Sequence, residues 1–170
     1  GYVDYFDTWA INPLDVFSNL SLIDKHHLSP AYINQRIKLE PDKRSNFLGI
    51  QSQLWTETAI NEDILDELIL PNLIVFSERA WTSSPDWHEI TDPTLQRKTS
   101  RAEWNVFSNT LGQRILPLIN YWYPSLAFHL PKPGAKIIDG QWRVRSSFPG
   151  LKIHYSVNGQ LPNSTHPAYE

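Results

Sequence analysis

The 170-residue chain contains no cysteine, which excludes disulfide bonds, thiolate metal ligands and thiol nucleophiles. Its charge is nearly balanced, with 15 Lys and Arg against 18 Asp and Glu, so it carries no basic footprint for nucleic acid or an anionic membrane. No apolar run approaches the roughly 18 residues of a membrane-spanning helix. A Gly-rich phosphate loop and a Ser-based nucleophile motif are also missing. These absences exclude several functional classes, but they do not indicate a cellular compartment.

Proline and tryptophan are abundant instead, with 13 and 7 residues. Many prolines indicate many connections between short elements, and the tryptophans indicate a core or a ligand surface. Two segments, 2–7 and 47–56, are predicted to be β-strands that are buried on both faces, as in a parallel sheet. The Pro-containing stretch 8–45 between them has little periodicity, and a short helix is expected near 30–36.

Helical signals follow the second predicted strand. Asn61 is a good N-cap for a helix that reaches Leu70, and Pro71 then kinks or divides the helical segment that continues to Trp81. Ser100 opens a capping box and is predicted to start the clearest helix. The apolar stripe of that helix consists of Trp104, Phe107, Leu111, Ile115 and Leu118, with Ser108 off the stripe.

The C-terminal stretch reads as β-structure. Residues 137–145 form a hairpin around Asp139-Gly140, and 151–157 alternates like another strand before the turn Asn158-Gly159. A partner strand should follow that turn, but none is recognised in the segment that contains Pro162 and Pro167.

The candidate ligand-binding residues lie at the ends of the two predicted strands. Residues i and i+2 of a strand share a face, so Trp55 and Glu57 are expected to lie side by side, as are Tyr5 and Asp7. An aromatic plate beside a carboxylate suits a pyranose, whose C–H face stacks and whose hydroxyls donate to the acid. The alternative from spacing alone is a core Trp and an exposed strand-end Glu.

Strands alternating with helices predict an α/β fold with a parallel sheet. In a closed barrel the functional residues sit at the C-terminal strand ends, so these side chains would face one mouth. A complete barrel needs about 250 residues, and only about 125 precede the β-rich tail. The sequence therefore predicts a piece of a larger barrel.

At these residues the sequence resembles the family 20 glycoside hydrolases, the β-N-acetylhexosaminidases, and among them the bacterial chitobiases. The segments that carry the resemblance are Tyr5-Phe6-Asp7, 49–58 (GIQSQLWTET), Pro71 with 77–81 (SERAW), 104–107 (WNVF), 111–114 (LGQR), 130–135 (LPKPGA) and 149–156 (PGLKIHYS). Their order and spacing match the C-terminal part of the family over nearly the whole chain.

The resemblance implies that residues 1–125 are the last two β/α units of a catalytic (β/α)8 TIM barrel. Residues 130–170 would be the start of a small C-terminal β-sandwich of Ig-like type. Tyr5 matches the tyrosine that bonds the acetamido oxygen of the substrate. Trp55 matches a wall of the acetamido pocket, and Glu57 matches the glutamate that holds hydroxyls of the terminal sugar.

The resemblance also implies substrate-assisted retaining catalysis, in which the acetamido oxygen attacks the anomeric carbon to give an oxazolinium intermediate, an exception to the usual two-carboxylate scheme. The Asp-Glu acid/base pair of the family is expected upstream of Gly1, so no catalytic residue is assigned in this chain. Asp66-Glu67 is the only such dipeptide here and is interpreted as a solvated helix face. No cofactor or metal is expected, and His26-His27 is interpreted as a solvated loop.

The predicted function is therefore part of an enzyme that hydrolyses terminal non-reducing N-acetyl-β-D-hexosamine residues of chitobiose and glycans. The expected partners are an oligosaccharide containing N-acetylglucosamine or N-acetylgalactosamine and the remainder of the parent enzyme, and family habit implies a secreted or periplasmic location. The chain alone is expected to be inactive. The alternative is a non-catalytic carbohydrate-binding or interaction module, a pseudoenzyme remnant.

Four further residues are considered for their residue type and position. Asp7 and Phe17 are possible additional contacts for the sugar. Arg79 is interpreted as an ion-pair partner at the base of the barrel, and Trp142 as an ordinary strand residue with a lesser chance of being a sugar platform.

Overall fold

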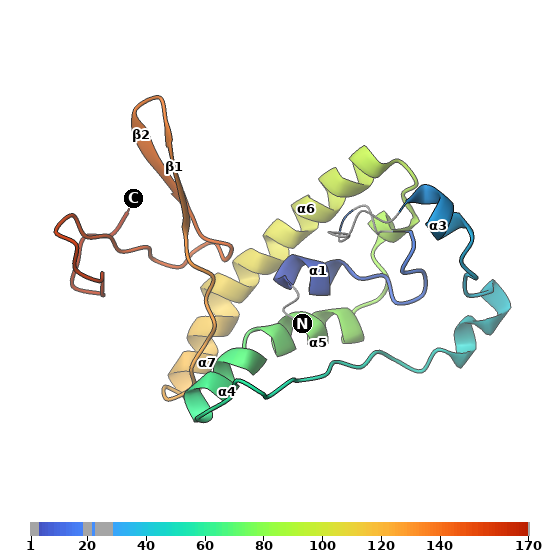
Figure 1. The fold of residues 1–170 in the computed structure, drawn as a ribbon, viewed down its shortest axis with the longest axis horizontal. Coiled ribbons are helices and arrows are strands. Elements are labelled where there is room, and N and C mark those ends of the chain that lie inside the picture. Colours follow the sequence, from blue (N-terminus) through green and yellow to red (C-terminus); the bar gives the residue numbers. More distant parts are fainter. Residues whose placement is uncertain (1–3, 19–21, 23–28, 170) are drawn as a thin grey trace. The chain divides into compact units, whose positions relative to one another are not determined.

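The computed structural model describes residues 4–18, 22 and 29–169. The chain divides into two compact units, residues 1–104 and 105–170, which are described separately. Its helical elements are α1 (Tyr5–Ala10), α3 (Pro30–Asn34), the 3₁₀ turn η1 (Pro41–Asn46), α4 (Glu62–Ile69), α5 (Asn72–Trp81), the 3₁₀ turn η2 (Asp86–Glu89), α6 (Pro93–Thr110), the π-helical turn η3 (Leu111–Ile115) and α7 (Leu116–Trp122) (Figure 1). The strands are β1 (Gly134–Ile138) and β2 (Gln141–Arg145).

The core of the first unit is a cluster of four aromatic side chains. Trp9 of α1 stacks on Trp87 of η2 with ring centroids 5.4 Å apart, and it meets Trp104 of α6 edge-on at 5.6 Å. Phe6 meets Trp104 edge-on at 5.7 Å. Edge-on and offset contacts at these separations are the favoured geometries of aromatic pairs. The cluster joins α1, which also packs on α5, to the later helices of the unit.

The prediction of a strand at 2–7 is wrong for the part that the structure describes, because Tyr5 begins helix α1. Asp4 caps this helix, since its Oδ1 accepts from the Phe6 N–H at 2.9 Å. Phe6, Trp9 and Ala10 are buried, and their spacing of i, i+3 and i+4 places them on one helix face. The Asp4 cap and the i, i+3, i+4 spacing can be recognised in the sequence. The strand prediction gave more weight to the content of aromatic and β-branched residues.

The prediction of a strand at 47–56 is also wrong in this structure. The segment is extended but unpaired, and among the described residues the backbone of 48–55 makes no hydrogen bond. A strand forms only when neighbouring backbone groups pair with it, and no described strand lies beside this segment. The predicted burial of both faces of this segment is also wrong, since Leu48 is 96% exposed.

The expected helices around Pro71 are confirmed as two abutting helices, α4 and α5. The Asn61 Oδ1 accepts from the Ile64 N–H at 2.9 Å, which is the predicted cap. The short helix expected near 30–36 is present as α3, with Pro30 at its first turn and Ser29 as its cap. Each of these cap and proline signals lies within a few residues of the helix that it specifies, and the structure contains each of these helices.

The start predicted for the long helix is wrong, since α6 begins at Pro93 and not at Ser100. Asp92 provides the cap: its Oδ1 accepts from the Leu95 N–H at 2.6 Å. Ser100 lies inside the helix, where it is buried and its hydroxyl donates to the Arg97 carbonyl at 3.1 Å. A serine that bonds back to its own helix satisfies its hydroxyl without ending the helix.

The predicted apolar stripe is displaced by the π turn η3. Trp104 and Leu111 are buried as expected, but beyond the turn Leu116 is buried while Leu118 is 40% exposed. The Leu116 N–H bonds to the Leu111 carbonyl, so the turn holds one residue more than an α turn and rotates the following positions. Ser108 was expected off the stripe and is buried.

In the second unit, the hairpin at 137–145 is confirmed. Strands β1 and β2 pair antiparallel with Ile137 opposite Trp142 and Ile138 opposite Gln141. Asp139 and Gly140 connect them with φ of 51° and 74°, as a tight hairpin turn with both central residues left-handed requires.

The segment 151–157 forms no full strand but does find a partner. His154 and Ala168 form an isolated antiparallel bridge, the Tyr155 N–H donates to the Pro167 carbonyl at 3.1 Å, and the Tyr169 N–H donates to the Ile153 carbonyl at 2.8 Å. The returning segment contains Pro162 and Pro167 and was therefore not recognised as a strand. Proline is compatible with this edge position, because a proline carbonyl still accepts a hydrogen bond.

Candidate functional site

Trp55 and Glu57 lie in the extended segment between η1 and α4. Both side chains are exposed, and the Trp55 indole is 65% accessible. The alternative of a core tryptophan at this position does not hold in this structure. An exposed indole next to an exposed carboxylate offers a stacking plate and a hydrogen-bond acceptor to a ligand.

Tyr5 is held differently, at the first position of α1. Its side chain is half-buried, and burial, with a smaller contribution from the charge of Asp4, raises the pKa of the Tyr5 hydroxyl to about 12. The phenol is therefore protonated throughout the physiological pH range. A protonated phenol can donate a hydrogen bond to a carbonyl oxygen.

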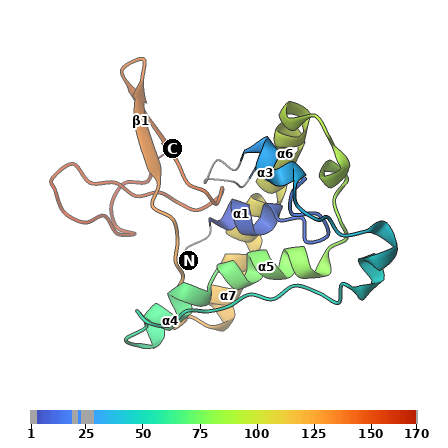
Figure 2. The same cartoon turned by 45° about the vertical axis from the view of Figure 1, so that its right-hand side comes forward.

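The structure does not bring the segments of Tyr5 and Trp55 to a common rim. In both views helix α5 lies between α1 and the extended segment that runs from η1 to α4 (Figures 1 and 2). The remaining candidates, Asp7 in α1 and Phe17 in the turn after it, are half-buried. The Phe17 N–H donates to Asp15 Oδ1 at 3.2 Å, which fixes the turn.

A buried basic pair, Arg79 and His88, was not singled out by the sequence as a pair. Arg79 is 6% exposed and His88 is 4% exposed, and the Arg79 Nη1 and both ring nitrogens of His88 have no hydrogen-bond partner among the described residues. The ion pair expected for Arg79 is not formed within that part of the chain. Glu103, whose charge favours the Arg79 cation, instead accepts from the Trp87 Nε1 at 3.1 Å.

Burial dominates the electrostatics of this pair. It lowers the pKa of Arg79, and the carboxylates of Glu78 and Glu103 act in the opposite direction. Burial also lowers the pKa of His88 to about 4, and the positive charge of Arg79 adds to the effect. His88 is therefore a neutral ring near pH 7, packed edge-on against Trp87 at 4.2 Å. Only tertiary packing reveals this pair, since no sequence motif links Arg79 to His88.

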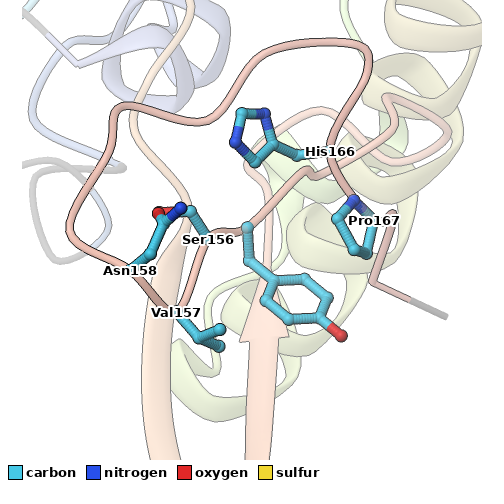
Figure 3. Close-up of a pocket in the computed structure, with 6 residues that line it drawn as sticks. Ser156, Val157, Asn158, His166 and Pro167 are labelled. Atoms are coloured by element: carbon cyan, nitrogen blue, oxygen red, sulfur yellow. The ribbon is translucent and has the colours of Figure 1, made fainter.

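A small hollow lies in the second unit. It encloses about 220 Å³ and is lined by Tyr155, Ser156, Val157, Asn158, His166 and Pro167. Figure 3 shows Ser156, Val157 and Asn158 along one segment and His166 and Pro167 on the other. Trp142 of β2, in the same unit, is 63% exposed, so it is not a core residue in this structure.

Two general features bear on function. Across residues 4–18, 22 and 29–169, no helix is long and apolar enough to cross a membrane. The same residues contain no group of three or more His, Asp or Glu side chains that would hold a metal ion. His26-His27, interpreted above as a solvated loop, lies outside the described residues.

Two family models match the chain in tandem. Residues 2–84 match the catalytic domain of glycosyl hydrolase family 20, a domain of the TIM-barrel type, and residues 124–168 match the chitobiase/beta-hexosaminidase C-terminal domain. The first match contains Tyr5, Trp55 and Glu57.

Two curated relatives agree with these matches. An N,N'-diacetylchitobiase from Vibrio harveyi is 29% identical over 123 residues, which cover 67% of this chain and 14% of that protein. A beta-hexosaminidase from Vibrio vulnificus is 31% identical over 135 residues, which cover 70% of this chain and 16% of that protein. The chain thus spans about a sixth or less of the length of these relatives. From the two matched domains and these relatives, the chain belongs to the family 20 glycoside hydrolases.

Proposed function

We propose that this chain is the C-terminal part of a β-N-acetylhexosaminidase, hereafter the parent enzyme, which removes terminal N-acetyl-β-D-hexosamine residues from the non-reducing ends of chitobiose and glycans. The observation that carries the proposal is the match of residues 2–84 to the family 20 catalytic domain, together with relatives named as a chitobiase and a hexosaminidase. The parent enzyme would supply the Asp-Glu acid/base pair from upstream of Gly1. A secreted or periplasmic location is part of the proposal.

The proposal extends to the fold. Residues 1–125 would be the last two β/α units of the barrel, and residues 130–170 the start of the C-terminal β-sandwich. In the parent enzyme, 2–7 and 47–56 would become strands by pairing with their barrel neighbours. The open backbone of 48–55 and its exposed apolar side chains, such as Leu48, support this, because parallel strands of a barrel bury both faces and pair on both edges.

In this proposal three side chains contact the terminal sugar. The Tyr5 phenol donates to the acetamido oxygen as that oxygen becomes a nucleophile, and its pKa of about 12 keeps the donor proton in place. The Trp55 indole walls the acetamido group and excludes competing water. The Glu57 carboxylate accepts from sugar hydroxyls, and charge-assisted hydrogen bonds of this kind are about twice as strong as neutral ones.

The test uses the full-length parent enzyme and a nitrophenyl N-acetyl-β-D-glucosaminide. Tyr5→Phe removes a donor that acts in the transition state, so kcat should fall about 100-fold. Glu57→Gln removes a charged acceptor, so kcat/KM should fall about tenfold to 100-fold. Glu62→Gln, at an exposed position of α4, is the matched control and should leave both constants unchanged.

One result would decide against the proposed site and another against the proposed function. Wild-type kinetics of the Glu57→Gln and Tyr5→Phe enzymes would remove both residues from the site. A parent protein with no upstream Asp-Glu pair and no turnover would instead favour the non-catalytic carbohydrate-binding module. The isolated 170-residue chain is expected to show no turnover in the same assay.

A further inference from the structure

The paired C-terminal segments of the second unit present an ordered aromatic face. In an antiparallel pair, directly opposite residues share a face, and the bridge of His154 with Ala168 sets the register. Tyr155 therefore lies opposite Pro167, and Ile153 lies opposite Tyr169, on the face that does not carry His154. On this shared face Tyr155 and Tyr169 are diagonal neighbours, a separation that aromatic side chains bridge.

A hydrogen bond joins a residue of this face to the backbone of the hairpin. The Tyr169 hydroxyl donates to the Trp142 carbonyl at 2.9 Å, which fastens the returning segment to strand β2. Trp142 is 63% exposed and Tyr155 is 46% exposed, while Tyr169 is half-buried. We call these three side chains, Tyr155, Tyr169 and Trp142, the aromatic row. Each of its two ends leaves a large part of an aromatic side chain open to solvent.

The hollow adjoins one end of the row, because Tyr155 lines it. None of its lining side chains is an acid, a lysine or an arginine, so it suits an uncharged ligand. It offers polar groups as well. Ser156, Asn158 and His166 contribute polar side chains to the lining (Figure 3), and the His166 Nδ1 lies 3.0 Å from the Asn163 Oδ1. An aromatic wall combined with a few neutral polar groups suits one pyranose ring.

We propose that the aromatic row and its hollow form a carbohydrate-binding surface that is separate from Trp55 and Glu57 and that takes a neutral oligosaccharide of pyranose rings. One ring would enter the hollow against Tyr155, and further rings would follow the row toward Trp142. The choice of N-acetylglucosamine oligomers as the ligand rests on the proposed function, whereas the surface itself rests on the register, exposure and neutrality described above.

The test is a titration of the ¹⁵N-labelled 170-residue chain with tetra-N-acetylchitotetraose. The indole N–H resonance of Trp142 should shift with saturation. By calorimetry, Tyr155→Ala should weaken binding roughly tenfold, as expected for the loss of one aromatic contact. Tyr155→Phe keeps the ring and should bind like the wild type, which separates lost stacking from lost folding. Trp122→Ala, at an exposed indole outside the row, is the matched control and should bind normally.

Each contrary outcome overturns the proposal. Absence of binding at millimolar oligosaccharide would do so, as would shifts that appear at Trp55 and not at Trp142, or an affinity that Tyr155→Ala leaves unchanged. A Trp142 shift that also follows dilution of the chain without sugar would assign the row to self-association. Failure here is distinguishable from failure of the proposed function, which is judged by the kinetics of the Tyr5 and Glu57 variants in the parent enzyme.

Discussion

His88 gives the first unit a titratable group whose burial has a measurable consequence. Its ring is neutral in the folded chain, because burial and the nearby Arg79 cation lower its pKa to about 4. In the unfolded chain the ordinary value is about 6.5. Between these two values the unfolded state binds the extra proton, so the free energy of unfolding decreases as the pH falls from about 6.5 to 4. Well above pH 6.5 this residue contributes no pH dependence.

We therefore predict that the first unit loses about 2 kcal/mol of stability through His88 between pH 7 and pH 5. Urea unfolding followed by tryptophan fluorescence at both pH values measures the loss, since Trp87 contacts the His88 ring. His88→Leu should flatten that part of the pH profile. His166→Gln, in the second unit, is the control and should keep it. Equal pH dependence in the His88→Leu and wild-type chains would show that His88 does not titrate on unfolding.

At the scale of single elements, a glycine in the π turn η3 lets another segment of the chain pack closely against it. A Cβ atom at Gly112 would lie 2.5 Å from the Pro149 carbonyl oxygen and 3.2 Å from the Phe148 Cβ. Phe148 is fully buried, and its segment can approach the helix this closely only because Gly112 has no side chain. The obstructing atoms belong mainly to backbone, which cannot rotate away as a flexible side chain can.

Gly112→Ala is predicted to lower the stability of the second unit by about 1–3 kcal/mol, the usual cost of overpacking. Alanine has a higher helix propensity than glycine, by about 1 kcal/mol, which offsets part of this loss. This gain is smaller than the upper part of the 1–3 kcal/mol range. Thermal unfolding followed by circular dichroism measures the change. Gly134→Ala is the matched control, because a Cβ there meets no atom within 4 Å and should shift the melting temperature little. A Gly112→Ala chain as stable as wild type would contradict the close approach.

Predictions from the sequence were correct where a few neighbouring residues specify the structure. The Asn61 cap and the Asp139-Gly140 turn were predicted because a few neighbouring residues specify each of them. The strands at 2–7 and 47–56 failed because a strand needs partners distant in sequence, and the described residues place none beside them. The predicted roles of the site residues stay predictions: Trp55 and Glu57 are exposed on one segment, and the geometry expected to join them to Tyr5 depends on the same sheet partners. The buried Arg79 and His88 pair depended on tertiary packing alone.

At the scale of the whole molecule, the extended segment after η1 is a surface for association. Among the described residues its backbone at 48–55 is unpaired, while Leu48 and Trp55 are largely exposed. An open strand edge with apolar side chains is a template for pairing with another chain. In the proposed parent enzyme the neighbouring barrel strands would occupy this template. In the 170-residue chain by itself, a second copy is the available partner.

We predict that the 170-residue chain self-associates at concentrations of tens of micromolar and above, and sedimentation velocity across a dilution series measures this. Leu48→Lys should shift the distribution toward monomer, because a charge on an exposed edge opposes pairing. Val106→Lys, at an exposed apolar position of α6, is the matched control and should leave the distribution unchanged. A strictly monomeric wild-type chain would rule out the segment as an open edge. Equal dissociation by both variants would place the contact elsewhere, because only pairing through 48–55 makes the association sensitive to Leu48 alone.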